Sequence, residues 1–105
     1  MVEQRKNQRF ELALPLRVLR IGAGQVVYSA TTRNISSCGV LFECDREIAV
    51  GGTIEYVVAL TDANGIKVDL RCTGKVVRLE KALDFGPHRI AATLDRYEFI
   101  RRAAA

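Results

Sequence analysis

The chain lacks any apolar run close to the roughly 20 residues that a membrane-spanning helix needs. Its first nine residues carry charges with no apolar segment behind them, so they do not resemble a secretory signal. The 105 residues suffice for one modest hydrophobic core. We therefore predict one soluble domain over residues 1–105, with no membrane insertion and a cytoplasmic location.

Side chains that bind metals or perform catalysis are also scarce. There is one histidine, and the three cysteines form no C-x-x-C pair, which argues against a zinc site or a disulfide framework. Cys44 and Cys72 occupy apolar alternations and are predicted to be buried, whereas Cys38 is expected to be partly exposed. His88 follows Gly-Pro and is read as a loop residue. With no Walker loop and no convergent carboxylates, we predict that the protein is not an enzyme.

Aromatic residues are few, at 7% of the chain, and tryptophan is absent. Tyr28, Phe42 and Tyr56 stand at alternating positions typical of a core. Barrels that bind single-stranded nucleic acid use exposed aromatic side chains over a basic groove. The net charge of +4 favours anionic partners, but this composition argues against a nucleic-acid polymer as a partner.

What the chain does contain is alternation of apolar and polar residues with a period of two, which indicates strands with one buried face. The Asn64-Gly65 pair predicts a tight hairpin. Pro15 predicts an edge strand or an irregularity, and Gly74 a bulge or bend. The alternation predicts six strands, over residues 12–18, 26–32, 40–44, 54–60, 66–76 and 90–94.

After the last strand, Asp95 and Glu98 match a capping box, which predicts a short helix over residues 96–105 carrying Tyr97, Phe99 and Ile100. The predicted fold class is therefore all-β: a small six-stranded antiparallel β-barrel with a short C-terminal helix. Within it, residues 1–10 form a flexible tail and residues 11–95 form the barrel.

Two polar clusters are not explained by this alternation. Arg5 and Arg9 form an R-x-x-x-R, and arginine pairs bidentately with phosphate or with guanine O6 and N7 and also stacks on bases. Asn34, Ser36 and Gly39 form an N-x-S-x-x-G, which offers an amide for a base edge, a hydroxyl and a backbone without a side chain. Each cluster alone is also compatible with a solvated tail or an ordinary turn.

The order and spacing of the two clusters resemble the signature of the PilZ-domain family of bacterial receptors for cyclic di-GMP. That signature is R-x-x-x-R followed by [D/N]-x-S-x-x-G, and it is met by Arg5, Arg9, Asn34, Ser36 and Gly39. The segment 72–78 is similar to a later strand of the family that carries G-x-V-x-R. The resemblance covers nearly the whole chain, since the family is a six-stranded barrel with a terminal helix.

The resemblance implies a role for each of these residues. Arg5 and Arg9 would grip guanine edges and phosphates and stack on a base. Asn34 and Ser36 would bind the guanine or its phosphate from the barrel surface, and Gly39 would keep the wall open. The implied function is a cyclic di-GMP-binding regulatory module that orders its tail on the ligand and signals through an unidentified effector protein. The alternative is a ligand-independent PilZ-like adaptor that binds only protein.

Overall fold

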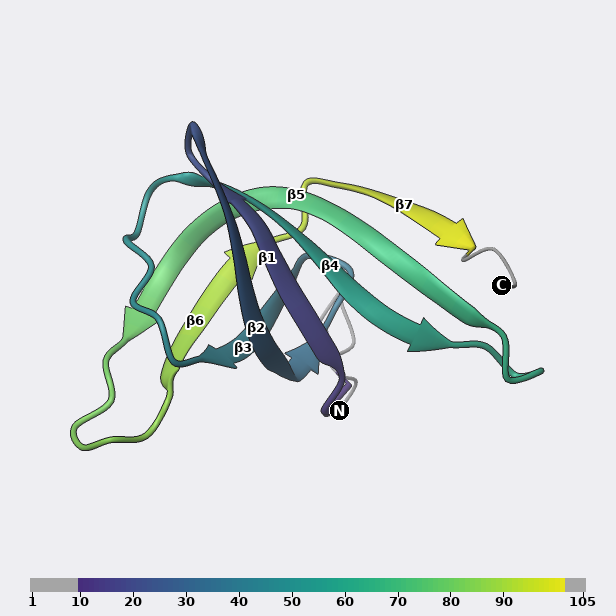
Figure 1. Cartoon of the computed structure of the whole chain (residues 1–105), viewed down its shortest axis with the longest axis horizontal. Coiled ribbons are helices and arrows are strands. Elements are labelled where there is room, and N and C mark those ends of the chain that lie inside the picture. The colour runs from purple at the N-terminus through teal and green to yellow at the C-terminus, as the bar shows by residue number, and fades with distance from the viewer. Residues whose placement is uncertain (1–9, 102–105) are drawn as a thin grey trace, which may run out of the picture.

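A computed structural model describes residues 10–101, and this part of the chain is built entirely from strands and their connections (Figure 1). None of the described residues belongs to a helix that could cross a membrane. The strands are β1 (Pro15–Ile21), β2 (Gly24–Ile35), β3 (Gly39–Cys44), β4 (Thr53–Thr61), β5 (Lys67–Glu80), β6 (His88–Thr93) and β7 (Arg96–Arg101).

Six of these strands close into a barrel. They follow the order β4-β1-β2-β3-β6-β5, every pairing is antiparallel, and β4 also pairs with β5, which completes the ring. Closure leaves these strands without long free edges. Gly65 adopts a φ of 81° in the β4–β5 connection, as the hairpin signal predicts. The six-stranded antiparallel barrel predicted from the alternation is confirmed.

The core fills the inside of the ring. Phe42 and Tyr56 have no exposed surface, and their ring centroids lie 6.3 Å apart. The Tyr56 hydroxyl donates a hydrogen bond to the Thr93 carbonyl at 3.0 Å, which ties β4 to the end of β6. Cys44 and Cys72 are buried as predicted, and Cys38 is exposed. Burial raises the pKa of Cys72 to about 12.

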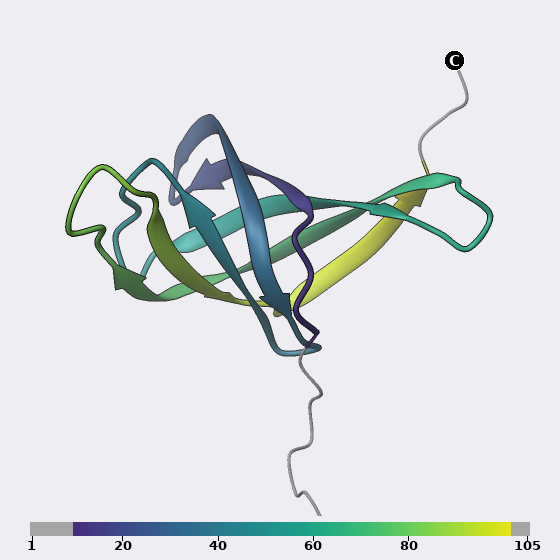
Figure 2. The ribbon, with the colours of Figure 1, turned by 90° about the horizontal axis from the view of Figure 1, so that it is seen from below.

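The predicted C-terminal helix is wrong for the described residues. Residues 96–101 form β7, which pairs with β5 over Val68–Thr73. The reason lies in β5, because β6 pairs only with its last part, Val76–Glu80. The first part would otherwise expose unpaired backbone groups, and a helix over residues 96–105 is shorter than the roughly 12–15 residues that an isolated helix needs to be stable. Figure 2 shows β4, β5 and β7 continuing as a sheet beyond the barrel.

Three further expectations, on the edge position of Pro15, the start of the first strand and the loop position of His88, are wrong. Pro15 does not lie on an edge, because β1 pairs with β2 and β4 on its two sides; Pro15 is instead the first residue of β1, where its missing N–H costs little. The strand predicted from Leu12 therefore begins later. His88 is the first residue of β6, and its Nδ1 accepts the N–H of Ala82 at 3.0 Å.

Gly74 shows no register shift, which rules out the bulge predicted there as the alternative to a bend. The register of β5 against β6 shifts between Val76 and Arg78 instead. Glycine is required at position 74 for a steric reason, since a Cβ built there would lie 1.8 Å from the carbonyl oxygen of Thr93. This is where the chain leaves β6 and turns into β7, and only glycine leaves room for the crossing.

The segment before β1 runs beside β2. The buried Thr32 hydroxyl accepts the N–H of Leu14 at 2.8 Å and donates to the carbonyl of Leu12. Phe10 and Ile35 exchange two backbone hydrogen bonds, each 2.9 Å long. These bonds fix the path of the chain as it enters the barrel.

Candidate functional site

Asn34 faces the outside of the barrel because of a bulge in β2. In the pairing of β2 with β3, Thr32 lies opposite Phe42 and Asn34 opposite Leu41, so Arg33 has no residue opposite it. With strict alternation, Asn34 would point inward like the buried Thr32. The extra residue reverses the alternation and places Asn34 beside Leu41 on the outer face.

A second bulge does the same for Arg78 on β5. Val76 lies opposite Ala92 and Arg78 opposite Ala91, which leaves Val77 as the extra residue. Val76 and Ala92 are buried, whereas Arg78 is exposed. The bulge therefore turns Arg78 outward beside Ala91.

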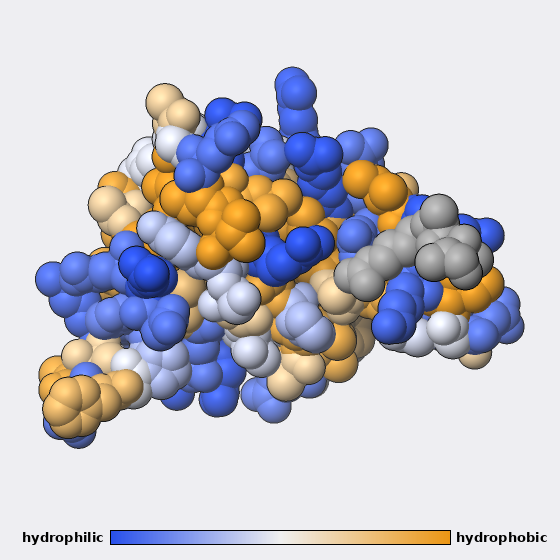
Figure 3. All heavy atoms as spheres, viewed as in Figure 1, coloured by the Kyte–Doolittle hydropathy of each residue, from blue (hydrophilic) through white to orange (hydrophobic). Residues whose placement is uncertain are grey.

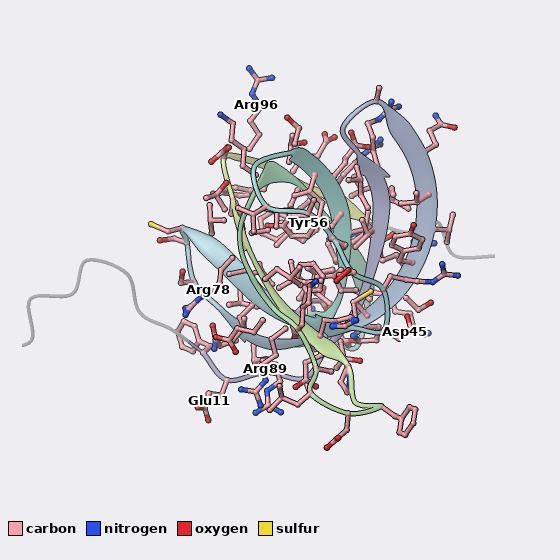
Figure 4. The ribbon with its side chains drawn as sticks, turned by 90° about the vertical axis from the view of Figure 1, so that its left-hand side faces the viewer. Glu11, Asp45, Tyr56, Arg78, Arg89 and Arg96 are labelled. Atoms are coloured by element: carbon pink, nitrogen blue, oxygen red, sulfur yellow. The ribbon has the colours of Figure 1, made fainter. Side chains whose placement is uncertain are left out.

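The two bulges border one shallow pocket on the outer wall. Asn34, Leu41, Ala91 and Arg78 form a single row across β2, β3, β6 and β5. Neighbouring strands are about 4.8 Å apart, so the two ends of this row are about 14 Å apart. The pocket has a volume of about 360 Å³ and is lined by Asn34, Ser36, Cys38, Gly39, Val40, Leu41, Val77, Arg78, Ala91, Ala92 and Thr93. Figure 4 shows Arg78 and Arg89 outside the ribbon of the barrel and Tyr56 inside it.

Ser36 and Gly39 hold the turn between β2 and β3. The N–H of Ser36 donates to the Gly39 carbonyl at 2.9 Å, and the Ser36 hydroxyl accepts the N–H of Cys38 at 3.2 Å. Gly39 does not have a positive φ. A Cβ on Gly39 would lie 2.7 Å from the Ala92 carbonyl oxygen, so the packing of β3 on β6 requires glycine here. Its role in leaving room for a ligand stays a prediction.

The polar side chains at the two ends of the row, Asn34 and Arg78, can turn to a ligand. Within residues 10–101 the Asn34 side-chain amide makes no hydrogen bond, although the residue is half-buried. Arg78 Nη1 lies 3.6 Å from Glu80 Oε2, and the two side chains are 64% and 55% exposed. An ion pair this exposed is worth little, so the guanidinium can turn to a ligand at small cost.

The charge cluster beside the row is net positive. Glu43 Oε2 lies 3.3 Å from Arg89 Nε and 3.7 Å from Arg33 Nη1. Two guanidinium groups around one carboxylate leave the local field favourable to an anion. The pocket can thus receive a flat base over Leu41 and Ala91 with a phosphate near Arg78.

The structure brings three of the five predicted site residues together, since Asn34, Ser36 and Gly39 all line the pocket. Arg5 and Arg9 lie outside the described residues. Phe10, which follows Arg9 in the sequence, pairs with Ile35, between Asn34 and Ser36. The N-terminal segment therefore enters the barrel beside the pocket.

Sequence reasoning missed the other half of the row. Leu41 and Ala91 look like ordinary strand residues, and only the pairing of β3 with β6 brings them together. Arg78 had a signal, because it ends the G-x-V-x-R segment, but its outward direction depends on the bulge at Val77. The described part of the chain holds no group of three His, Cys, Asp or Glu side chains that could bind a metal ion.

Comparisons with known proteins agree with this fold. The PilZ domain family matches residues 3–98. Among solved structures, the Bacillus subtilis inhibitor of motility (MotI/DgrA) has a similar fold, with a TM-score of 0.69 and 12% sequence identity. The match covers 92% of this chain and 44% of that one, so this chain spans less than half of that protein. At this identity the likeness shows a shared fold. A comparison with curated protein sequences finds no significant match.

Proposed function

This chain belongs to the PilZ-domain family, and we propose that it is a regulatory module that binds cyclic di-GMP and signals through a partner protein. The observation that carries the proposal is the row from Asn34 to Arg78, with an open amide at one end and an exposed guanidinium at the other. Both groups suit a guanine nucleotide that carries phosphate.

In the proposed complex a guanine lies flat on the apolar floor between the two polar ends. The Asn34 amide oxygen accepts from the guanine N–H groups. The methyl group of Ala91 and the side chain of Leu41 contact the face of the base. Arg78 pairs with a phosphate or with O6 and N7 of a guanine, and the weak bond to Glu80 is given up.

Arg5 and Arg9 complete the site from the N-terminal side. The bridge between Phe10 and Ile35 fixes the point from which this segment starts. We propose that residues 1–9 close over the ligand, so that both guanidinium groups reach the bases and phosphates. A micromolar complex needs about 8 kcal/mol, and each bidentate arginine–guanine pair supplies roughly 1–3 kcal/mol of discrimination. Two such arginines, together with base stacking and phosphate attraction, reach that scale, and they must also offset the cost of ordering the segment.

The proposed output follows from that closure. A segment folded over the pocket presents a surface that the ligand-free protein lacks, and an effector protein can recognise that surface. The cyclic nucleotide is a ligand in this scheme, and the chain itself performs no chemical step on it.

Isothermal titration with cyclic di-GMP, beside GTP and cyclic di-AMP, tests the proposal. We expect saturable binding of cyclic di-GMP in the micromolar range or tighter, and little heat from the other two nucleotides. The stoichiometry distinguishes one bound ligand from an intercalated pair. No binding to a folded sample would overturn the proposal.

A ligand-independent adaptor is the second candidate, and one observation favours it. The β5–β6 loop exposes Leu83 and Phe85 almost completely, at 99% and 106% of their reference surfaces. The loop is anchored at its base by Lys81, whose Nζ lies 2.9 Å from Glu47 Oε2. Figure 3 shows an apolar projection at this end of the molecule. An adaptor of this kind would bind its partner equally with and without cyclic di-GMP.

A further inference from the structure

We propose that β7 is a self-association edge, through which two copies of this chain pair antiparallel into a symmetric dimer. Among the described residues, β7 pairs with β5 on one side only. All six of its residues are exposed. Figures 1 and 2 show β7 at the margin of the molecule, along the outer side of β5. An unpaired edge of this kind is a template for another strand.

One face of β7 continues the apolar interior of the barrel. Tyr97 lies opposite Cys72 and Phe99 opposite Leu70, and both partners belong to the core. Tyr97 and Phe99 are nevertheless 60% and 63% exposed, and their rings contact each other edge to face with centroids 5.8 Å apart. The apolar surface of the core therefore extends onto an edge strand, and no other part of the described chain covers the aromatic side chains of that strand.

The other face of β7 identifies a second copy as the partner. Arg71 Nη2 lies 3.0 Å from Glu55 Oε1, and Arg71 also lies opposite Glu98, so charges alternate in sign toward the edge. Pairing that sets Tyr97 opposite Tyr97 of the partner subunit brings Arg96 opposite Glu98 of the partner subunit, twice by symmetry. The alternation of charge then continues across the interface.

The same charges disfavour a register shifted by two residues. Pairing centred on Glu98 would set this carboxylate against its own copy, which is destabilising. Each copy has one β7 edge, and a two-fold axis uses both edges, so the assembly closes at two chains. Because the contact is short, its area falls at the low end for specific interfaces, and we expect weak association. The pocket lies on β2, β3, β6 and the end of β5, away from β7, so it stays open in the dimer.

Analytical ultracentrifugation of the full chain, from about 1 μM to about 1 mM, tests the proposal over the range expected for a weak interface. We expect a reversible monomer–dimer equilibrium. Glu98→Arg and Arg96→Glu should each weaken dimerisation about tenfold, because each creates two like-charge pairs. The double variant R96E/E98R should restore it. Asp45→Arg, with the same change in net charge as Glu98→Arg but away from β7, is the control and should dimerise normally.

Three results would overturn the proposal: a monomer at every concentration, a dimer that both single variants leave unchanged, or single-variant losses that the double variant does not recover. The last result would assign the effect to contacts within one chain, such as that of Glu98 with Arg71. Circular dichroism melting shows whether each variant folds. If Glu98→Arg does not fold, Arg96→Glu tests the same charge pair.

Discussion

Asn34 and Arg78 lie at opposite ends of one cross-strand row, and each is turned outward by a bulge in its own strand. The extra residues are Arg33 on β2 and Val77 on β5. Two bulges at the two borders of one pocket are the kind of irregularity that re-aims side chains near binding sites. This relationship makes Asn34 and Arg78 the residues through which the proposed site is most directly tested.

Asn34→Ala should weaken cyclic di-GMP binding by roughly fivefold to a hundredfold, the range for one lost base-edge contact. The side chain is half-buried on the outer wall and makes no hydrogen bond within residues 10–101, so the melting temperature should hardly change. Asn34→Asp should bind at least as well as the original, because a carboxylate accepts more strongly from guanine N–H groups. Titration calorimetry measures both. Gln25→Ala, an exposed amide on the same strand, is the control; an Asn34→Ala protein with unchanged affinity would remove Asn34 from the site.

Arg78→Ala should reduce affinity and also flatten its dependence on salt. A guanidinium on phosphate contributes a charge interaction that salt screens, so its loss removes part of that dependence. Titrations at low and high salt measure the effect. Arg17, an exposed arginine on β1, provides a matched control through Arg17→Ala. Equal losses in the two variants would indicate a general effect of net charge.

Arg5→Ala and Arg9→Ala should each abolish most of the affinity while the barrel stays folded. Neither residue belongs to an apolar alternation, so removing its side chain takes nothing from the core. Lys6→Ala, which removes one positive charge from the same segment, is the control and should bind nearly normally. If Arg9→Ala lowered the melting temperature sharply, a structural role would explain the residue better.

Gly39→Ala should destabilise the fold by about 1–3 kcal/mol, the usual cost of forcing an atom into a packed site. The new Cβ would lie 2.7 Å from the Ala92 carbonyl oxygen. Gly74→Ala should cost more, because its Cβ would approach the Thr93 carbonyl to 1.8 Å. Gly52→Ala, with nothing within 4 Å, is the control. Urea unfolding measures all three; a Gly39→Ala protein of unchanged stability would contradict this packing role.

One of the three cysteines should react quickly with a thiol reagent. Cys38 is exposed, whereas Cys44 and Cys72 are buried. Burial raises the pKa of Cys44 and brings that of Cys72 to about 12, so burial disfavours the reactive thiolate at both sites. Ellman's reagent should titrate one thiol in the folded protein and all three after denaturation. Cys38→Ser should eliminate the fast reaction, and a second fast thiol would contradict the buried core positions.

The C-terminal segment shows where local patterns mislead. Asp95 and Glu98 match a helix cap, yet Tyr97 and Phe99 also alternate with charged residues over the same stretch. A sequence window contains both signals and cannot rank them. The segment forms a strand because β6 leaves one edge of the first part of β5 unpaired, and β7 pairs with that edge. Backbone hydrogen bonds along that edge outweighed a helix shorter than the roughly 12–15 residues needed for stability in isolation.

The sequence by itself determined the strands of the barrel, its core and the hairpin at Gly65, because the alternation of side chains across a pleated strand is local. It also marked Asn34, Ser36 and Gly39, whose spacing lies within one turn. Only the tertiary structure decided that Asn34 and Arg78 share an outward row with Leu41 and Ala91, and that residues 96–101 form a strand. Both outcomes depend on which strands become neighbours and where their register slips, and such pairings join residues far apart in the chain.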